Sequence, residues 1–399
     1  MLDTDAQPLA KPGEAVLRWN TRVHSIPEIE AELARIWSSV SLTTPGESGD
    51  EERRVAPRSS VMNLVVIAGR AEVGERVAAI VEGLTGRHPS RTLVVSQADP
   101  DGPAWLDAQV QAHCMLPRDG AAETCAELVY VTAGGQSGQH LAGCVSPLLI
   151  HDLPVTIWWP GEPRLDSPQT TDLLQIADRV LVDGSAWSGD GLARLVAMSR
   201  LPRAFNVEVA DFALLRQSRW REAIASSFDR PGLLPFLGGI EKVTVTYAAR
   251  DSLPGMANVV KPLYHVAWLA SRLKMTADEA LSGSMAKWGG YTGALRSGRR
   301  QVAVALKPVE STAPRGTTLS VTIEAEKGRE RLVVDVTAQA DGVTVQANVN
   351  GHALPERQFF APRRRESDLL AETIEGGADD RISAASLEMA AAIVEGRGG

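Results

Sequence analysis

The spacing of apolar residues along the first forty positions predicts one short amphipathic helix. Ser25-Ile-Pro-Glu28 has the form of a capping box, and apolar residues follow it at helical spacing on one face. We therefore expect a helix over residues 26–40. Residues 41–60 offer almost nothing that could be buried, which is typical of a flexible linker. A tethered helix with an apolar stripe must dock, and we expect it to dock on its own chain, with a partner surface as the alternative.

From residue 61 the pattern changes to strand-helix alternation, which is the signature of an α/β fold. The sequence predicts a first domain over 61–205, with a mostly parallel sheet and helices on both faces. The expected strands are 62–68, 92–96, 128–132, 155–159 and 179–183, and the expected helices are 73–84, one from residue 140, 171–177 and 191–199.

The second half has a different pattern, which predicts a smaller α+β domain over 206–399 with an antiparallel sheet. Residues 1–60 are left as the N-terminal helix and its linker. Turn residues Lys327-Gly328 and Asp341-Gly342 separate alternating runs, so an antiparallel meander is expected there. The runs are 301–307, 318–324, 331–337 and 342–349; a strand is expected at 242–247, and helices are expected from about 211, at 259–273, 368–374 and 382–394.

Residues 145–161 are the least generic stretch of the chain. Pro154 disfavours helical geometry at the preceding residue, and a β-branched and aromatic run follows it until Pro160-Gly161. This pattern predicts one αβ step of a parallel sheet. Trp158 and Trp159 end the strand, where open α/β sheets usually place ligands or partners. We expect them mostly to fill the core, and keep Asp152, Trp158 and Trp159 as candidate partner-binding residues.

Two short segments could bind an anion. Gly134, Gly135 and Gly138 lie between a predicted strand and a predicted helix, the position at which glycine-rich loops present N–H groups to phosphate. An ordinary βα turn is the alternative, since the segment lacks the P-loop and dinucleotide spacings. His88 and Arg91 flank another turn and could together hold an anion. Their alternative is a helix-ending turn with Arg91 paired to a neighbouring carboxylate.

Composition and charge exclude some classes of partner. The formal net charge is -8 over 399 residues, whereas nucleic-acid binding normally needs clustered Lys and Arg. No apolar run reaches the roughly 18 residues that span a bilayer, so no membrane association is expected. The acidic N-terminus is unlike a signal peptide, and three cysteines make no even framework. The cytoplasm is the expected compartment.

The cysteines and histidines do not form a standard metal site. Cys114, Cys125 and Cys144, with His113 and His140, match no zinc spacing, so we expect no metal. Cys114 and Cys125 could pair if their strands are neighbours, although no Cys-x-x-Cys motif supports a redox role. There is no His-Glu-x-x-His, no assignable triad and no nucleotide fingerprint, so no cofactor and no catalytic residue is predicted.

Several of these segments together resemble the OpcA family of glucose-6-phosphate dehydrogenase assembly proteins. The resemblance runs from about residue 61 to the end. Its segments are His88-Pro-Ser-Arg91, residues 145–160 with Asp-Leu-Pro and Trp-Trp-Pro, residues 211–231 around Trp220-Arg221, Trp268-Leu-Ala-Ser-Arg272, and the helical segment from Arg363.

The resemblance implies a non-catalytic protein that binds glucose-6-phosphate dehydrogenase and promotes its active oligomer, so that it acts as an allosteric activator in the oxidative pentose phosphate pathway and its supply of NADPH. In the cyanobacterial branch it implies thiol-dependent control, for which the cysteines here give no clear counterpart. The alternative from another class is a sugar-phosphate-binding enzyme or sensor that uses Gly134 to Gly138, His88 and Arg91. A third is a scaffold that uses the N-terminal helix. Self-association is not predicted either way.

Overall fold

The computed structural model describes residues 15–38, 43–44, 54–55, 60–69, 73–74, 76–77, 80, 84, 87–99, 101–115, 124–250, 255, 257–284, 286, 288–376 and 378–396. The chain divides into two compact units, Met1–Leu181 with Glu366–Glu375, and Val182–Arg365 with Gly376–Gly399. From the sequence we expected the boundary between the two domains near residue 205, with the second domain the smaller. The alternation of strand and helix continues past residue 181, so the pattern shows no break at that point.

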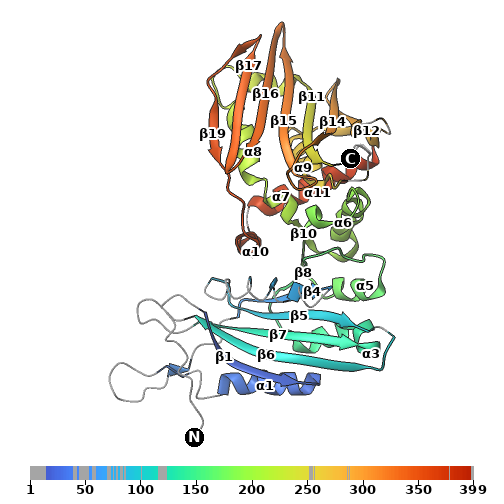
Figure 1. The fold of residues 1–399 in the computed structure, drawn as a ribbon, viewed down its shortest axis with the longest axis vertical. Helices are drawn as coiled ribbons and strands as arrows, with labels where there is room; N and C mark the ends of the chain where they lie inside the picture. The colour runs from blue at the N-terminus through green and yellow to red at the C-terminus, as the bar shows by residue number, and fades with distance from the viewer. Residues whose placement is uncertain are drawn as a thin grey trace. The chain divides into compact units, whose positions relative to one another are not determined.

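A mostly parallel sheet forms the centre of the first unit, as predicted (Figure 1). Its strands lie in the order β1-β6-β7-β5-β4-β8-β9. The β7–β5, β5–β4 and β4–β8 pairs are parallel, and β1–β6 and β6–β7 are antiparallel. The bounds are β1 (Ala15–Val23), β4 (Met62–Ala68), β5 (Ser90–Ala98), β6 (Trp105–Met115), β7 (Thr124–Gly134), β8 (Val155–Trp159) and β9 (Arg179–Val182).

Five strands of this sheet follow the order of a doubly wound sheet. In chain order they are β4, β5, β7, β8 and β9, and in space they run 3-2-1-4-5. The order therefore reverses between β4 and β8. Strands β1 and β6 were not predicted. In β6, polar Asp107, Gln109 and Gln111 alternate with small apolar residues, so its apolar signal is weak although the strand is well paired.

Helix α1 (Ile26–Ser38) confirms the predicted N-terminal helix. Ser25 Oγ accepts a hydrogen bond from the Glu28 N–H at 3.4 Å, and the Glu28 carboxylate accepts one from the His24 N–H at 2.8 Å. Its apolar face is buried on β6 and β1, so docking on its own chain is confirmed. The predicted linker 41–60 lies largely outside the described residues; β2 (Thr43–Thr44) and β3 (Arg54–Val55) pair within it.

The other helices of the first unit are short and lie mostly in the connections between strands. They are α3 (Gly135–Gln139), α4 (Leu141–Val145), the 3-10 helix η2 (Ser146–Leu148), α5 (Pro168–Leu174) and α10 (Glu366–Glu375). Helix α10 confirms the helix predicted at 368–374. In the part of the chain that the structure describes, no helix combines the length and apolar character needed to cross a membrane.

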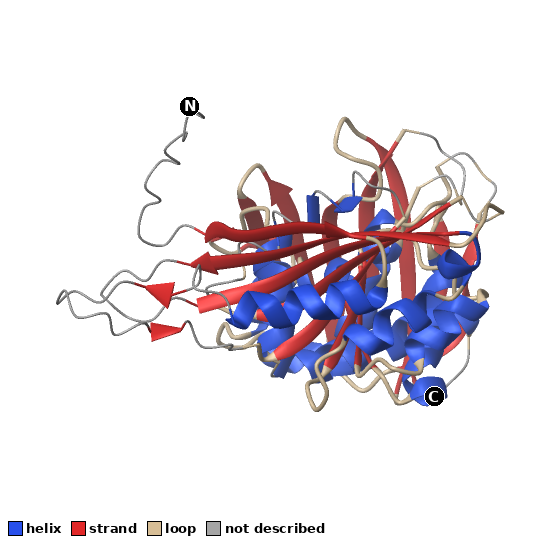
Figure 2. Cartoon of the chain, turned by 90° about the horizontal axis from the view of Figure 1, so that it is seen from below, coloured by secondary structure: helices blue, strands red, loops and turns tan. Residues whose placement is uncertain are grey.

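The second unit contains a mostly antiparallel sheet of nine strands, several of which are labelled in Figure 1. Figure 2 colours the helices and strands of the chain separately. The predicted meander is confirmed for the last three runs, which form consecutive antiparallel strands β15, β16 and β17. It is wrong for the first run, because β11 lies between β14 and β15 and is parallel to β14. Residues 311–317 connect β14 to β15 and are longer than a tight hairpin loop, which allows this crossing. The bounds are β11 (Ile240–Ala249), β12 (Thr276–Gly283), β13 (Tyr291–Ser297), β14 (Arg300–Glu310), β15 (Thr318–Lys327), β16 (Glu330–Gln339), β17 (Gly342–Val349), β18 (His352–Ala353) and β19 (Arg357–Phe360).

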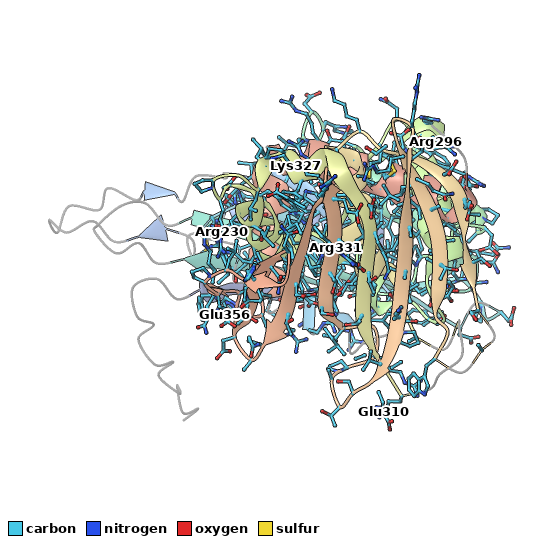
Figure 3. All side chains as sticks on the ribbon, turned by 90° about the horizontal axis from the view of Figure 1, so that it is seen from above. Arg230, Arg296, Glu310, Lys327, Arg331 and Glu356 are labelled. Atoms are coloured by element: carbon cyan, nitrogen blue, oxygen red, sulfur yellow. A yellow bond between two sulfur atoms is a disulfide. The ribbon has the colours of Figure 1, made fainter. Side chains whose placement is uncertain are left out.

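Helices α8, α9 and α11 pack against strands of this sheet. Helix α9 (Val260–Arg272) and helix α11 (Ala378–Glu395) confirm predicted helices, whereas the helix expected from residue 211 is two short ones, α7 (Phe212–Leu215) and α8 (Ser218–Phe228). On this sheet Glu324 forms ion pairs with both Lys242 and Arg331, and Arg331 is labelled in Figure 3. The remaining elements are η3 (Gly184–Ala186), α6 (Leu192–Phe205), β10 (Glu208–Asp211) and η4 (Leu234–Gly239).

Candidate functional site

The stretch 145–161 forms a tight corner that a buried asparagine holds in place. Asn63, at the start of β4, donates from Nδ2 to the carbonyls of Ile150 and Leu153, and its Oδ1 accepts from the Ile150 N–H at 2.8 Å. After the corner, the Val155 N–H donates to Asp178 Oδ2 at 2.7 Å. These bonds satisfy backbone groups that the turn leaves unpaired. The predicted αβ step is therefore a fixed structural corner.

The three candidate partner-binding residues of this corner have different environments. Asp152 is exposed and has a φ of 66°, a left-handed conformation that Asp tolerates better than most residues. Trp158 and Trp159 are only 1% and 4% exposed, so both belong to the core. Of the three, Asp152 is the one whose side chain a partner could reach without rearrangement.

His88 contacts a carboxylate of its own unit. Its Nε2 lies 3.0 Å from Oε1 of Glu375 on α10, and Arg87 donates to the same oxygen at 2.6 Å. Hydrogen bonds from His88 and Arg87 lower the pKa of Glu375, and the bond from His88 has the larger effect. Together these contacts attach α10 to the turn before β5.

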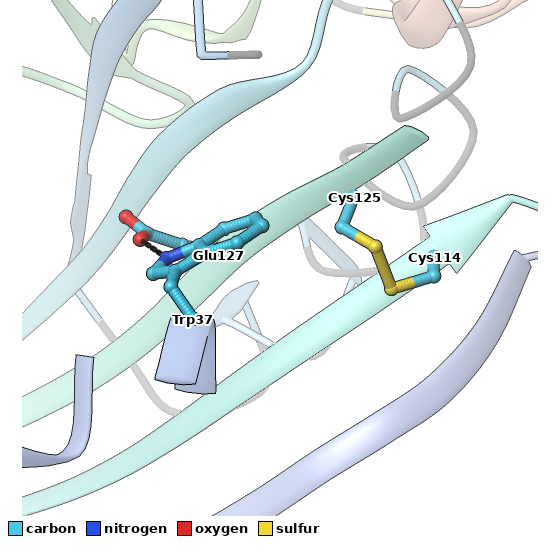
Figure 4. Close-up of a disulfide and its surroundings, with 4 residues drawn as sticks. All are labelled: Trp37, Cys114, Cys125 and Glu127. Carbon is cyan, nitrogen blue, oxygen red and sulfur yellow. Dashed lines mark hydrogen bonds between the residues drawn. A yellow bond between two sulfur atoms is a disulfide. The ribbon is translucent and has the colours of Figure 1, made fainter. Parts of the chain in front are cut away.

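Arg91 is buried and forms an ion pair with Glu127 on the neighbouring strand β7. Its Nη1 donates to the Leu148 carbonyl at 2.8 Å, while Glu127 also accepts a hydrogen bond from the Trp37 indole (Figure 4). Helix α1 is thus joined to the sheet through Trp37. This is the alternative expected from the sequence, in which Arg91 pairs with a neighbouring carboxylate.

The structure does not bring the candidate anion-binding residues together. Gly134 pairs with Ala98 at the carboxyl end of β7, seven residues beyond Glu127, which is about 23 Å along a strand. The glycines have packing reasons of their own. A Cβ at Gly135 would lie 2.3 Å from the Gly102 carbonyl oxygen, and one at Gly138 would lie 2.6 Å from that of Ala133. At Gly134 it would overlap the Trp105 indole. These contacts fit an ordinary βα turn.

Two of the cysteines form a disulfide. Cys114 on β6 and Cys125 on β7 are directly opposite in the antiparallel pair, and both are buried (Figure 4). Cys144 is a free, buried thiol whose pKa is raised by burial. Among the described residues no cluster of His, Cys, Asp and Glu could hold a metal ion. Cys114 and Cys125, which were considered as metal ligands from the sequence, are bonded to each other instead.

A buried carboxylate in the second unit was not predicted from the sequence. Asp211 ends β10, and its Oδ1 accepts from the N–H groups of Gly184 and Ala213, both at 2.8 Å. Its Oδ2 accepts from the Tyr264 hydroxyl at 2.9 Å. Burial raises the pKa of Asp211 to about 6, with a smaller contribution from the negative charge of Asp183. A Cβ at Gly184 would lie 2.5 Å from Oδ2, so glycine is required there.

The raised pKa of Asp211 predicts a pH dependence of stability. The folded-state pKa of Asp211, about 6, lies above its unfolded value of about 3.9, so protonation of this group stabilises the fold. This stabilisation is complete below pH 3.9 and is lost as the pH rises through 6. Between pH 5 and 7.5 the free energy of unfolding of the wild type should fall by about 1 kcal/mol because of this group. Asp211→Asn should remove that slope, since its Oδ1 can still accept from both N–H groups.

Urea unfolding across this pH range measures the effect. Asp229→Asn, at an exposed position, is the matched control and should keep the wild-type slope. An unchanged slope in Asp211→Asn would show that another group titrates.

Comparison with solved structures gives distant likenesses. A protein provisionally described as the oxidoreductase YvaA of Bacillus subtilis aligns with a TM-score of 0.45 and 10% identity, covering 85% of this chain and 96% of its own. A provisionally described oxidoreductase from Magnetospirillum magnetotacticum aligns with a TM-score of 0.46 and 16% identity, covering 84% and 99%. Likenesses at this level carry no argument about activity or ligand.

Curated relatives match about half of this chain. A protein of Synechocystis sp., provisionally named OxPP cycle protein OpcA, is 25% identical over 202 residues, which are 49% of this chain and 40% of that protein. The protein of the same provisional name from Nostoc punctiforme is 26% identical over 196 residues, with the same coverage. The matches thus span less than half the length of these relatives.

Two family models match consecutive parts of the chain. The model described as glucose-6-phosphate dehydrogenase subunit N-terminal domain matches residues 81–200, and the corresponding C-terminal domain model matches residues 207–387. Together they cover most of the chain, so this protein belongs to the OpcA family.

Proposed function

We propose that this chain is a non-catalytic partner of glucose-6-phosphate dehydrogenase that promotes the enzyme's active oligomer and so acts as its allosteric activator. The observation that carries the proposal is the match of both family models, which are described as dehydrogenase subunit domains. The provisional names of the cyanobacterial relatives, which refer to the OxPP cycle, support the same pathway. The cytoplasm remains the compartment in which we expect the protein to act.

The proposal includes Asp152 as a contact with the enzyme. Its carboxylate is exposed at the tip of a corner that Asn63 and Asp178 hold rigid. A rigid charged group loses little conformational entropy on binding, which favours it as a partner contact. Trp158 and Trp159 would then have a structural role, because their buried side chains anchor the strand β8 that follows this corner.

The test combines the purified chain with glucose-6-phosphate dehydrogenase of the same organism, and measures enzyme activity and the mass of the complex. We expect higher activity and a larger assembly in the presence of the chain. If neither quantity changes, the proposed function is wrong.

Asp152→Asn tests the contact, because Asn also tolerates a positive φ and removes only the charge. Loss of a charged hydrogen bond should weaken binding about tenfold. Asp166→Asn, at another exposed position of the first unit, is the control and should bind as the wild type does. Normal binding by Asp152→Asn would remove Asp152 from the interface and leave the activator role standing.

A further inference from the structure

The first unit contains a cavity of about 270 Å³ at the carboxyl ends of β4, β5 and β8. Ala68, Gln97 and Trp159 reach it from these three strands, and α5 with the loop before it forms another wall. The cavity lies where the strand order reverses, between β4 and β8. In doubly wound sheets, ligands bind in the crevice outside the carboxyl ends at this position.

Two glycines leave backbone uncovered in the wall of this cavity. Gly69 follows β4 and Gly161 follows β8, so they come from the two strands that flank the reversal. A Cβ at either position would meet no atom within 4 Å, and neither glycine has a positive φ. Neither packing nor backbone conformation therefore requires glycine there. The missing side chains keep the space beside both strand ends open to a ligand.

The polar groups of the wall can recognise a hydroxyl-rich molecule with a negative charge. Gln97 and Gln169 offer amide groups, and Glu162 offers carboxylate oxygens. Arg164 supplies a guanidinium, whose planar donors suit a phosphate group. In the part of the chain that the structure describes, no carboxylate forms an ion pair with Arg164. Trp159 adds an apolar surface to the same wall.

We propose that this cavity binds a small phosphorylated sugar, either free or as part of a nucleotide. Arg164 contacts the phosphate, and Gln97, Glu162 and Gln169 contact the hydroxyl groups. The volume lies just below the range of roughly 300–1,000 Å³ typical of small-molecule sites, which favours a small ligand over a whole dinucleotide. The site goes beyond the proposed partner role. It also differs from the anion site considered from the sequence, because Gly134 to Gly138 and Arg91 do not line it.

Isothermal titration calorimetry on the full chain tests the site, with glucose 6-phosphate as the sugar-phosphate probe and AMP as the nucleotide probe. At least one probe should bind with a Kd of about 1 mM or tighter. Glucose and adenosine should bind at least about tenfold more weakly than their phosphorylated forms, since they lose the charge-assisted bonds to Arg164.

Two substitutions locate the binding. Gly161→Leu should fill the cavity and weaken binding by about tenfold or more, and Arg164→Gln should weaken the phosphorylated probes by about tenfold. The matched controls are Gly238→Leu, at an exposed glycine with no atom within 4 Å of its Cβ, and Arg299→Gln, at an exposed turn. Both should bind as the wild type does, and the melting temperature of each variant confirms folding.

Failure of both probes to bind at up to about 10 mM would overturn the proposal. Binding that neither Gly161→Leu nor Arg164→Gln weakens would also overturn it, because the ligand would then lie elsewhere. Either result leaves the effect on glucose-6-phosphate dehydrogenase to be judged by its own assay.

Discussion

Replacing Glu127 by Ala should lower the free energy of unfolding by about 3–5 kcal/mol, because it leaves the Arg91 guanidinium buried without a counter-charge. Glu127 is fully buried, so water cannot replace the lost partner. The Trp37 indole loses its acceptor at the same time. Denaturant unfolding of the wild type and the variant measures the difference.

The buried pair of Arg91 and Glu127 should add little to the stability of the protein, relative to a pair of apolar residues of similar size in the same positions. Removing two charges from water is costly, and the Coulomb attraction of the pair only offsets that cost. The double variant Arg91→Met, Glu127→Leu should therefore be much closer to the wild type than Glu127→Ala. A double variant as unstable as the single one would show that the hydrogen bonds to Trp37 and to the Leu148 carbonyl carry most of the stability.

An exposed ion pair provides the matched control. Arg203 and Glu388 also form a close salt bridge, but both side chains are largely exposed to solvent. Exposed pairs contribute about 0–1 kcal/mol, so Glu388→Ala should stay within that range. If Glu127→Ala lowers the free energy of unfolding no more than Glu388→Ala does, burial of the Arg91–Glu127 pair does not make breaking it costly, and the prediction is wrong.

The elements with strong apolar periodicity are those that the sequence predicted. Helix α1, strands β4 and β8, and the meander β15 to β17 each place their apolar residues on one face or in one short run. Strand β6 was missed because its buried face is built from Ala108, Val110 and Ala112, small residues whose pattern is weak. Its pairing with β7 is fixed by tertiary contacts that no local pattern contains.

The candidate site was harder to predict for a related reason. A charged residue inside an apolar strand, such as Glu127 beside Leu128, is a signal of buried pairing that could have been noticed, since unpaired charges are rarely buried. Which cation it pairs with depends on the register of β5 against β7. The cavity near Gly69 and Gly161 depends on which strand ends become neighbours, and chain order does not reveal this.

Trp158→Ala should destabilise the protein by about 3–5 kcal/mol, the usual cost of emptying the space of a large buried aromatic side chain. Trp158 is among the largest fully buried side chains, on a strand whose five residues are all buried. Asp152→Asn, at the exposed tip of the same corner, should change stability by less than about 0.5 kcal/mol.

Comparing these two variants separates the two roles first considered for this stretch. If the corner is a structural support, Trp158→Ala lowers the unfolding free energy, and the fraction that remains folded binds glucose-6-phosphate dehydrogenase with unchanged affinity. If Trp158 is instead a recognition residue, its loss weakens binding while costing less than about 1 kcal/mol of stability. The burial of the Trp158 indole favours the first outcome, because a side chain almost without solvent exposure presents no surface to a partner.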